Sequence, residues 1–261
     1  ECWSLEEICL HDKAGDVAVA SAAEAFAKES GREVRVYKNN TDFHGASYGT
    51  HESYLVPRSI PVESLIGALM PLLVARQVLC GAGKVGAEHG PRCEYQISQR
   101  ADFFSEPVNA ETLYRRPVFN TRDEPHADPA KWVRLHVICG ESNMVSTAMQ
   151  MKLALTKAAI CLVETGDYPM WRLSDPVRAI KSVSRDPDGE GRIDLEGRSW
   201  TTPRQVIESY IEPFLACSAG ATGHYATELR DALIRALRLL DARLTDPGLF
   251  ARSDDWAAKR A

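Results

Sequence analysis

Five ionisable side chains lie within the seven residues from Arg122 to Asp128. They belong to the segment Asn-Thr-Arg-Asp-Glu-Pro-His-Ala-Asp, residues 120–128, which has apolar, strand-like residues on both sides. A connection between strands ordinarily uses Gly, Asn, Pro or Ser to meet its backbone constraints. Ionisable groups gathered at the end of a buried strand instead indicate a site for a charged ligand. A solvated charged loop with a helix-starting Pro is the alternative, and composition does not decide between the two.

A second polar cluster runs from Asn39 to Glu52 and includes Asn40 and His51. Side chains alternate faces along a strand, so His51 and Glu52 point apart and do not ligate one metal ion together. We therefore expect one of the two side chains to face a ligand and the other to be structural. A single histidine on a strand is more often a satisfied polar residue than a ligand.

The third cluster, Ser98 to Asp102, contains Arg100 at the end of a predicted strand. An arginine can hold a phosphate with two parallel hydrogen bonds, which lysine cannot do. Arg100 beside Arg122 would therefore form a phosphate clamp, with magnesium held by carboxylates in phosphoryl chemistry. A salt bridge from Arg100 to Asp102 or another acid is the alternative.

Several common motifs are missing or only superficially present. The run from Gly81 to Lys84 lacks the GxxxxGK[ST] spacing and follows a predicted helix, so it is interpreted as a helix end. The sequence contains no GxSxG and no HExxH pattern. Its seven cysteines include no CxxC pair, which indicates reduced core thiols in a cytoplasmic protein and no zinc cluster.

The bulk properties fit an ordinary globular chain of 261 residues with 44% hydrophobic and 26% charged residues. The net charge of −5 gives no basic field for nucleic acid, so no nucleic-acid partner is expected. The longest apolar run, 65–79, is interrupted by Pro71 and Arg76, so a core helix is expected and no membrane span. No signal peptide is visible.

The elements that must position these clusters alternate irregularly, which favours an α+β fold over a doubly wound one. Apolar spacing and capping residues predict the following helices and strands. The helices are expected over 5–29, 61–79 with a kink at Pro71, 144–162 capped by Ser142 or Asn143, a short one from Asp175-Pro176, one from Thr202-Pro203 to about 215, and 226–244 packed on the body. The strands are expected around 34–36 and 48–55 with a hairpin loop over 38–46, and at 93–100, 117–122 and 132–140, with a turn or hairpin at 186–197.

Several segments resemble, in order, those of one family, the Pup ligases and depupylases. They are 38–42, 47–55, 76–85, 98–100, and 120–128 followed by 134–137, and the likeness is close over 37–162 and looser after Gly166. The resemblance implies a glutamine-synthetase-like fold, a curved antiparallel sheet backed by helices that cradles ATP and Mg²⁺. It also implies two partners, a Pup-like ubiquitin-like modifier and lysine-bearing protein substrates.

The resemblance assigns Arg100 and Arg122 to the nucleotide phosphates, and His126, Asn40 and His51 to the lining of the ATP pocket. Family members begin with a Gly-x-Glu-x-Glu strand whose glutamates hold magnesium, and a later strand supplies a catalytic Asp. Both would lie upstream of Glu1, and a small C-terminal domain would lie beyond Ala261. Residues 1–261 are thus expected to be the central part of one large catalytic domain, with a sheet and nucleotide core over about 1–166 and a mostly helical part over about 167–261. This segment alone is expected to be inactive.

The branch of the family is left open by the residues. The segments 11–15, 80–84 and 142–144 resemble the ligase, whereas 45–48, 101–104 and 111–112 resemble the depupylase. We predict the ligase, which joins the C-terminal glutamate of the modifier to a lysine through an acyl phosphate, with the depupylase or deamidase as the alternative. Two other classes are considered, a metal-dependent hydrolase using His51 and His126 and a non-catalytic modifier-binding protein. The excess of arginine over histidine in the clusters argues against the hydrolase.

Overall fold

A four-stranded sheet with helices behind it forms the frame of the protein in the computed structural model, which describes residues 2–111 and 115–261. The strand order is β1-β6-β5-β4, formed by β1 (Thr50–Pro57), β6 (Trp132–Gly140), β5 (Arg116–Asn120) and β4 (Phe104–Asn109). β1 pairs antiparallel with β6, as does β5, whereas β4 and β5 run parallel. The α+β class is confirmed, but the sheet is small and mixed and not purely antiparallel.

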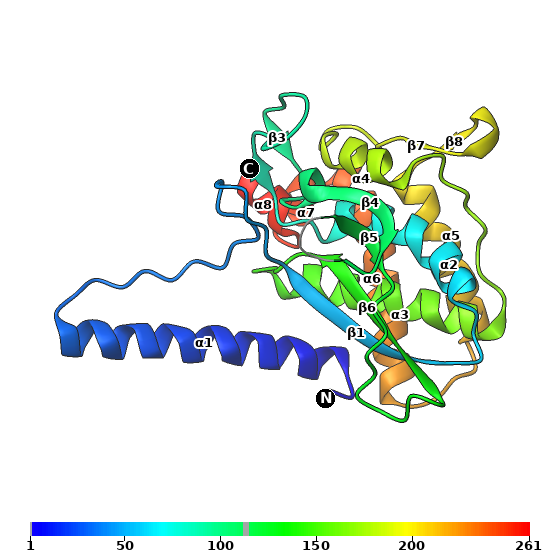
Figure 1. Ribbon diagram of the computed structural model, residues 1–261, viewed down its shortest axis with the longest axis horizontal. Coiled ribbons are helices and arrows are strands. Elements are labelled where there is room, and N and C mark those ends of the chain that lie inside the picture. The colour runs from blue at the N-terminus through cyan, green and yellow to red at the C-terminus, as the bar shows by residue number, and fades with distance from the viewer. Residues whose placement is uncertain (1, 112–114) are drawn as a thin grey trace.

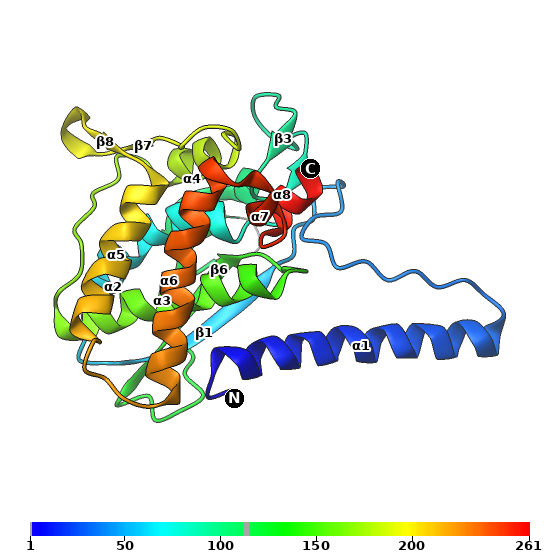
Figure 2. The ribbon, with the colours of Figure 1, turned by 180° about the vertical axis from the view of Figure 1, so that it is seen from behind.

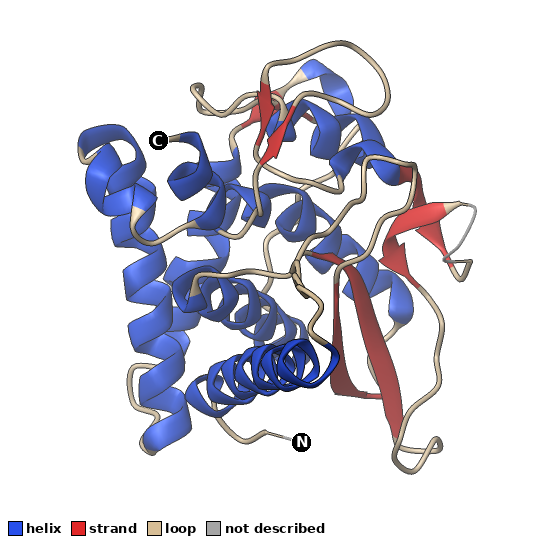
Figure 3. Ribbon diagram, turned by 90° about the vertical axis from the view of Figure 1, so that its left-hand side faces the viewer, coloured by secondary structure: helices blue, strands red, loops and turns tan. Residues whose placement is uncertain are grey.

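The two faces of the sheet differ because buried and exposed side chains alternate along β1. Glu52 and Val56 are buried, whereas His51, Ser53 and Leu55 are exposed. On β6, Leu135 and Val137 join the same hydrophobic core as Val56. Helices gather on one side of β1 and β6 (Figure 3). We call the opposite side, which carries His51, the open face.

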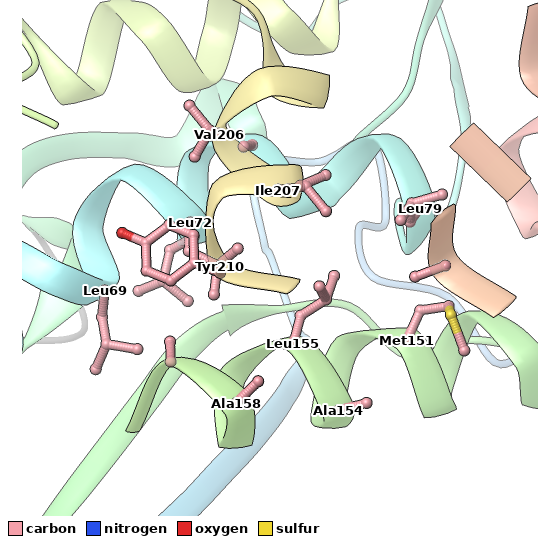
Figure 4. Packing of buried hydrophobic residues seen from close by; sticks show 14 of the residues in the cluster. Leu69, Leu72, Leu79, Met151, Ala154, Leu155, Ala158, Val206, Ile207 and Tyr210 are labelled. Carbon is pink, nitrogen blue, oxygen red and sulfur yellow. The ribbon is translucent and has the colours of Figure 1, made fainter. Parts of the chain in front are cut away.

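The core behind the sheet is built by α2 (Val62–Ala75), α3 (Ser146–Thr165) and α5 (Pro203–Cys217). Their apolar side chains interdigitate in Figure 4, and Tyr210 of α5 donates its hydroxyl proton to the Ala68 carbonyl oxygen. α2 runs through Pro71 and tightens at Arg76 into the 3-10 helix η1 (Arg76–Leu79). Val62–Leu79 is long and apolar enough to cross a membrane by composition, but 72% of it is buried inside the fold, as in a core helix.

The predicted first helix is confirmed as α1 (Leu5–Ser30), which projects away from the body (Figure 1). The Ser4 side chain accepts the Glu7 N–H at its start, and Gly31, with φ 69°, ends the helix. Among its residues only Leu5 and Cys9 are buried, because only the first turns contact α3. Lys38 lies against the exposed part of α1 through ion pairs with Asp12 and Asp16.

The helices predicted after residue 166 are present. Asp175 caps α4 (Pro176–Ser184), and Thr202 forms a capping box at the start of α5. α6 (His224–Thr245) packs across α3 and α5, as seen from behind in Figure 2, which confirms that it lies on the body. The predicted hairpin contains β7 (Ile193–Asp194), the 3-10 turn η3 (Glu196–Arg198) and β8 (Trp200–Thr201). The chain ends in α7 (Pro247–Ala251) and α8 (Asp255–Arg260).

Three predictions about local structure are wrong. Residues 34–36 form no strand, and 38–46 is closed only by a bridge between Thr41 and Ser47. Within 93–100 only β3 (Tyr95–Gln96) is a strand, paired with β2 (Lys84–Val85), and the chain then enters the 3-10 turn η2 (Ala101–Phe103). Thr112, part of one branch-specific segment, lies outside the described residues.

The predicted cap of α3 is also wrong. The helix begins after Val145 and has no capping side chain from Ser142 or Asn143. Asp255, at the start of α8, instead accepts the N–H groups of Met144 and Val145. A carboxylate more than a hundred residues away in sequence thus satisfies the N–H groups just before the helix.

Candidate anion-binding face

Two histidines meet on the open face of the sheet. Nδ1 of His51 and Nε2 of His136 lie 3.2 Å apart, and their rings meet edge to face with centroids 5.0 Å apart. The antiparallel register places Ser53 opposite His136, so His51 on β1 and His136 on β6 share this face. Nδ1 of His136 is buried and has no hydrogen-bond partner among the residues that the structure describes. A buried polar atom without a partner is a place where a ligand can bind.

Arginines surround this histidine pair. Burial lowers the pKa of His51, and the positive charges of Arg100, Arg134 and Arg116 lower it further. Burial, with Arg134 as the strongest neighbouring charge, lowers the pKa of His136 to about 4. Both rings are therefore neutral at pH 7, and one ring nitrogen donates to the other.

The hydrogen bonds of these three arginines go to neutral oxygen atoms. Arg134 donates from Nε to Ser53 Oγ at 3.1 Å, and Arg116 donates to the Ser47 carbonyl oxygen at 2.7 Å. Arg100 donates to the carbonyl oxygens of Ile138 and Gly140 and to Ser47 Oγ. Among the described residues no ion pair joins any of the three to a carboxylate, so their positive charge is not neutralised on this face.

Arg100 is 3% exposed and lies beneath the face, wedged between β1 and β6. Burial lowers the pKa of its guanidinium to about 10, partly opposed by Glu141. The alternative salt bridge from Arg100 to Asp102 is not formed, because Asp102 pairs with Arg185. Gly49 is required here, since a Cβ atom at that position would lie 2.6 Å from Arg100 Cζ and 2.7 Å from the Gly140 carbonyl oxygen.

Glu141 fixes the backbone around Arg100. Its carboxylate accepts the N–H groups of Arg100 and Ala82 and the hydroxyl proton of Ser98. Burial raises the pKa of Glu141, and these donors oppose that effect. Lys152, buried behind it, donates to the Glu141 carbonyl oxygen at 2.7 Å. One carboxylate thus joins the end of β6 to the loops at 81–83 and 98–101.

Asn40 is 1% exposed and structural in its contacts. Its amide exchanges two hydrogen bonds with the Ser142 backbone, at 2.6 and 3.2 Å, and its own N–H donates to Gln99 Oε1. These bonds tie the 40–49 loop to the end of β6, next to Arg100. Asn40 therefore has a structural role next to the open face, and its polar atoms already have hydrogen-bond partners.

The loop at 120–128, which the sequence singles out, lies in solvent at the edge of the sheet. Arg122 is exposed and pairs with Glu124 at 2.9 Å, and His126 is also exposed. Asp123 accepts from Arg58 and from the N–H of Arg134. The predicted clamp of Arg100 and Arg122 is thus not preformed, since one is buried under the sheet and the other is solvated.

His136, Arg116 and Arg134 are residues of this face that the sequence alone did not indicate. Arg134 and His136 stand two residues apart in the correctly predicted strand 132–140, so alternation alone places both on one face. Recognising that this face is the one that carries His51 requires the register between β1 and β6, which the sequence does not give.

The described residues alone do not provide a magnesium site. Over 2–111 and 115–261, no group of three or more His, Cys, Asp or Glu side chains converges so that it could hold a metal ion. The carboxylates of Asp123 and Glu124 in the neighbouring loop are engaged by arginines. We therefore assign no step to magnesium within this chain.

The fold and the open face together define an α+β protein with a sheet surface suited to an anion. The family model described as Pup-ligase protein matches residues 1–261. The chain therefore belongs to the Pup ligase and depupylase family.

Relatives from both branches are similar to the chain at comparable identity. A depupylase of Acidothermus cellulolyticus is 41% identical over 99% of this chain and 52% of its own length. A Pup deamidase/depupylase of Mycolicibacterium smegmatis is 42% identical over 98% of the chain and 48% of its own length. A Pup–protein ligase of Corynebacterium jeikeium is 36% identical over the whole chain and 58% of its own length. The chain thus spans about half the length of these relatives.

Two solved structures have the same fold. The Pup ligase PafA in complex with ADP superposes with a TM-score of 0.84 at 32% identity, over 100% of this chain and 59% of that one. PafA in complex with Pup gives a TM-score of 0.85 at 33% identity, over 99% of this chain and 55% of that one. The expected relationship to the Pup ligase and depupylase family is confirmed, and the α+β fold matches that of PafA.

Proposed function

We propose that the open face holds the phosphate groups of ATP or ADP in a Pup-modifying enzyme. The observation that carries this proposal is the set of three arginines, Arg100, Arg116 and Arg134, which form no ion pair with a carboxylate of the described residues and lie beside a neutral histidine pair. Positive groups fixed before the ligand arrives stabilise phosphate oxygens without the cost of reorganisation. The ADP bound in the related PafA structure supports the nucleotide assignment.

We assign the reaction to the ligase. ATP phosphorylates the C-terminal glutamate of a Pup-like modifier, and a substrate lysine amine then displaces the phosphate to form an isopeptide bond. The segments that resemble the ligase and the two similar PafA structures support this assignment. In this reaction Arg116 and Arg134 bind the phosphates, and Arg100 positions the strand ends next to them. The exposed Arg122 and His126 contact the nucleotide from the loop at 120–128.

The binding half of this proposal can be tested on the 261-residue chain by titration calorimetry with ADP. Arg134→Met removes one charge-assisted contact and should weaken ADP about tenfold or more. Arg58→Met is the matched control, because Arg58 pairs with Asp123 outside the histidine pair and should leave the affinity unchanged. Equal ADP affinity in the wild type and Arg134→Met would contradict the assignment of the face.

The reaction half needs a polypeptide extended to the length of the relatives. Incubation with ATP, magnesium, a Pup-type peptide ending in Glu and a lysine-bearing acceptor should give an adduct that lacks one water by intact mass. Cleavage of a preformed conjugate without new adduct would assign the depupylase instead. ADP binding with neither reaction would favour a non-catalytic modifier-binding protein. We expect the 261-residue chain alone to bind ADP and to show no turnover.

A further inference from the structure

An exposed phenylalanine is held in a strained conformation beside the open face. Phe43 is 60% exposed, and its φ of 59° lies in the left-handed region that side chains other than Gly rarely adopt. The loop around it is fixed by the bridge between Thr41 and Ser47 and by Asp42, which accepts the N–H groups of His44 and Ala46 at 2.8 and 3.0 Å. The chain therefore maintains an unfavourable backbone angle that presents an aromatic ring to solvent.

A buried cation supports this ring. The Lys84 side chain is 1% exposed, and its Nζ lies 5.2 Å from the Phe43 ring centroid and 5.5 Å from that of Phe103. Glu88 fixes the ammonium group through an ion pair of 2.8 Å. A cation against a ring stabilises its position while a second surface of the ring stays available. Phe43 is thus a pre-positioned aromatic platform.

The platform adjoins the anion-binding face through Ser47 and Phe103. Ser47, at the closing end of the Phe43 loop, accepts from both Arg100 and Arg116. The guanidinium of Arg116 also lies 5.9 Å from the Phe103 ring. An aromatic surface next to a phosphate-binding surface is the arrangement that a nucleotide requires, with the base on one and the phosphates on the other.

We propose that Phe43 stacks against the base of the nucleotide whose phosphates bind the open face, and that it makes the site prefer a nucleotide over inorganic polyphosphate. This inference rests on the proposed function, since it needs the phosphates to lie at Arg116 and Arg134. Lys84 acts as a positioning residue, because its ammonium group contacts the Phe43 ring, and Phe103 contacts the same ammonium group.

The test compares two probes, ADP and inorganic tripolyphosphate, by calorimetry on the 261-residue chain. Phe43→Ala should weaken ADP about tenfold, in the range that stacking contributes, and leave tripolyphosphate unchanged. Phe43→Tyr keeps a ring and should restore ADP affinity. Tyr37→Ala is the control, since Tyr37 is an aromatic residue with 74% exposure that lies before the loop.

Each outcome separates the two proposals. An unchanged ADP affinity in Phe43→Ala overturns the stacking role, and so does an equal loss for ADP and tripolyphosphate. If the wild type binds neither probe, or if Arg134→Met leaves both affinities unchanged, the anion-binding face itself is refuted and the stacking role with it. Thermal unfolding of Phe43→Ala shows whether the substitution has altered the fold. Because Ala carries a Cβ atom as Phe does, the left-handed angle itself predicts no change in Tm.

Discussion

The most severe test of the fold is the neutralisation of Glu52, which lies on β1 directly after His51 and points the opposite way. Its two carboxylate oxygens accept from Arg76 at 2.6 and 3.0 Å, and the two side chains are 1% and 2% exposed. Burial raises the pKa of Glu52, but the charge and hydrogen bonds of Arg76 outweigh that effect and hold it below its ordinary value. Arg76 also donates to the Lys152 carbonyl oxygen and to Thr156.

Glu52→Gln keeps the shape of the side chain and leaves the Arg76 charge buried without a counter-charge. Loss of one partner of a buried pair costs about 3–5 kcal/mol of the free energy of unfolding. For a chain of this size, that loss lowers the Tm by roughly 6–20 °C. Because the folded pKa of Glu52 lies below 4.5, the stability it gives is present above pH 4.5 and is lost as the pH falls through the folded value. The substitution should therefore also flatten the acid dependence of Tm.

Thermal and urea unfolding of wild type, Glu52→Gln and Asp123→Asn give the comparison. Asp123 forms an exposed ion pair with Arg58, at 33% and 39% exposure, so its neutralisation should cost less than about 1 kcal/mol. Below the unfolding transition, Glu52→Gln should bind ADP as the wild type does, since the pair lies on the face opposite the histidines. If Glu52→Gln changes the Tm as little as Asp123→Asn does, the buried Glu52–Arg76 pair does not stabilise this sheet as argued.

Three further substitutions test other parts of the site. Gly49→Ala should cost about 1–3 kcal/mol and weaken ADP, because the added Cβ meets Arg100 and backbone, whereas the exposed helical control Gly67→Ala should gain up to about 1 kcal/mol in urea unfolding. His136→Asn should reduce the loss of Tm between pH 6.5 and about 4 by the part due to His136, since the unfolded chain binds a proton there that the folded ring does not. Asp255→Ala should cost about 1–3 kcal/mol by calorimetry, because the N–H groups before α3 lose their acceptor.

The elements that the sequence predicted correctly are those whose signals are local. The capping box at Thr202, the stop at Gly31 and the alternation over 132–140 each specify an element within a few residues. The predicted strand over 93–100 is mostly irregular because its polar side chains bind other loops instead of a neighbouring strand, as Gln99 binds the carbonyl oxygens of Ala82 and Gly83. Local alternation does not contain that information.

For the site too, local signals were predictable from the sequence and distant contacts were not. Arg100 was identified by its type and its position near a strand end, but its engagement by the carbonyl oxygens of β6 depends on how β1 and β6 meet. His136 belongs to the site only because the register sets it against Ser53 and close to His51. The dense charges of 120–128 were the most visible feature of the sequence, and they lie exposed at the rim. The density of ionisable residues along the sequence thus indicated a loop beside the open face and not the residues at the centre of that face.

Arginine has two different roles on the two sides of β1. On the core side, Arg76 is fully compensated by Glu52, and the pair contributes to the structure. On the open side, Arg134 and Arg116 are held by hydroxyl and carbonyl oxygens, which orient a guanidinium without cancelling its charge. A chain with a net charge of −5 has acidic residues available, yet the described part of it supplies none as an ion-pair partner to these two arginines. A bound anion would supply the counter-charge that these guanidinium groups lack, so the face has the electrostatics of a binding site and not of a structural network.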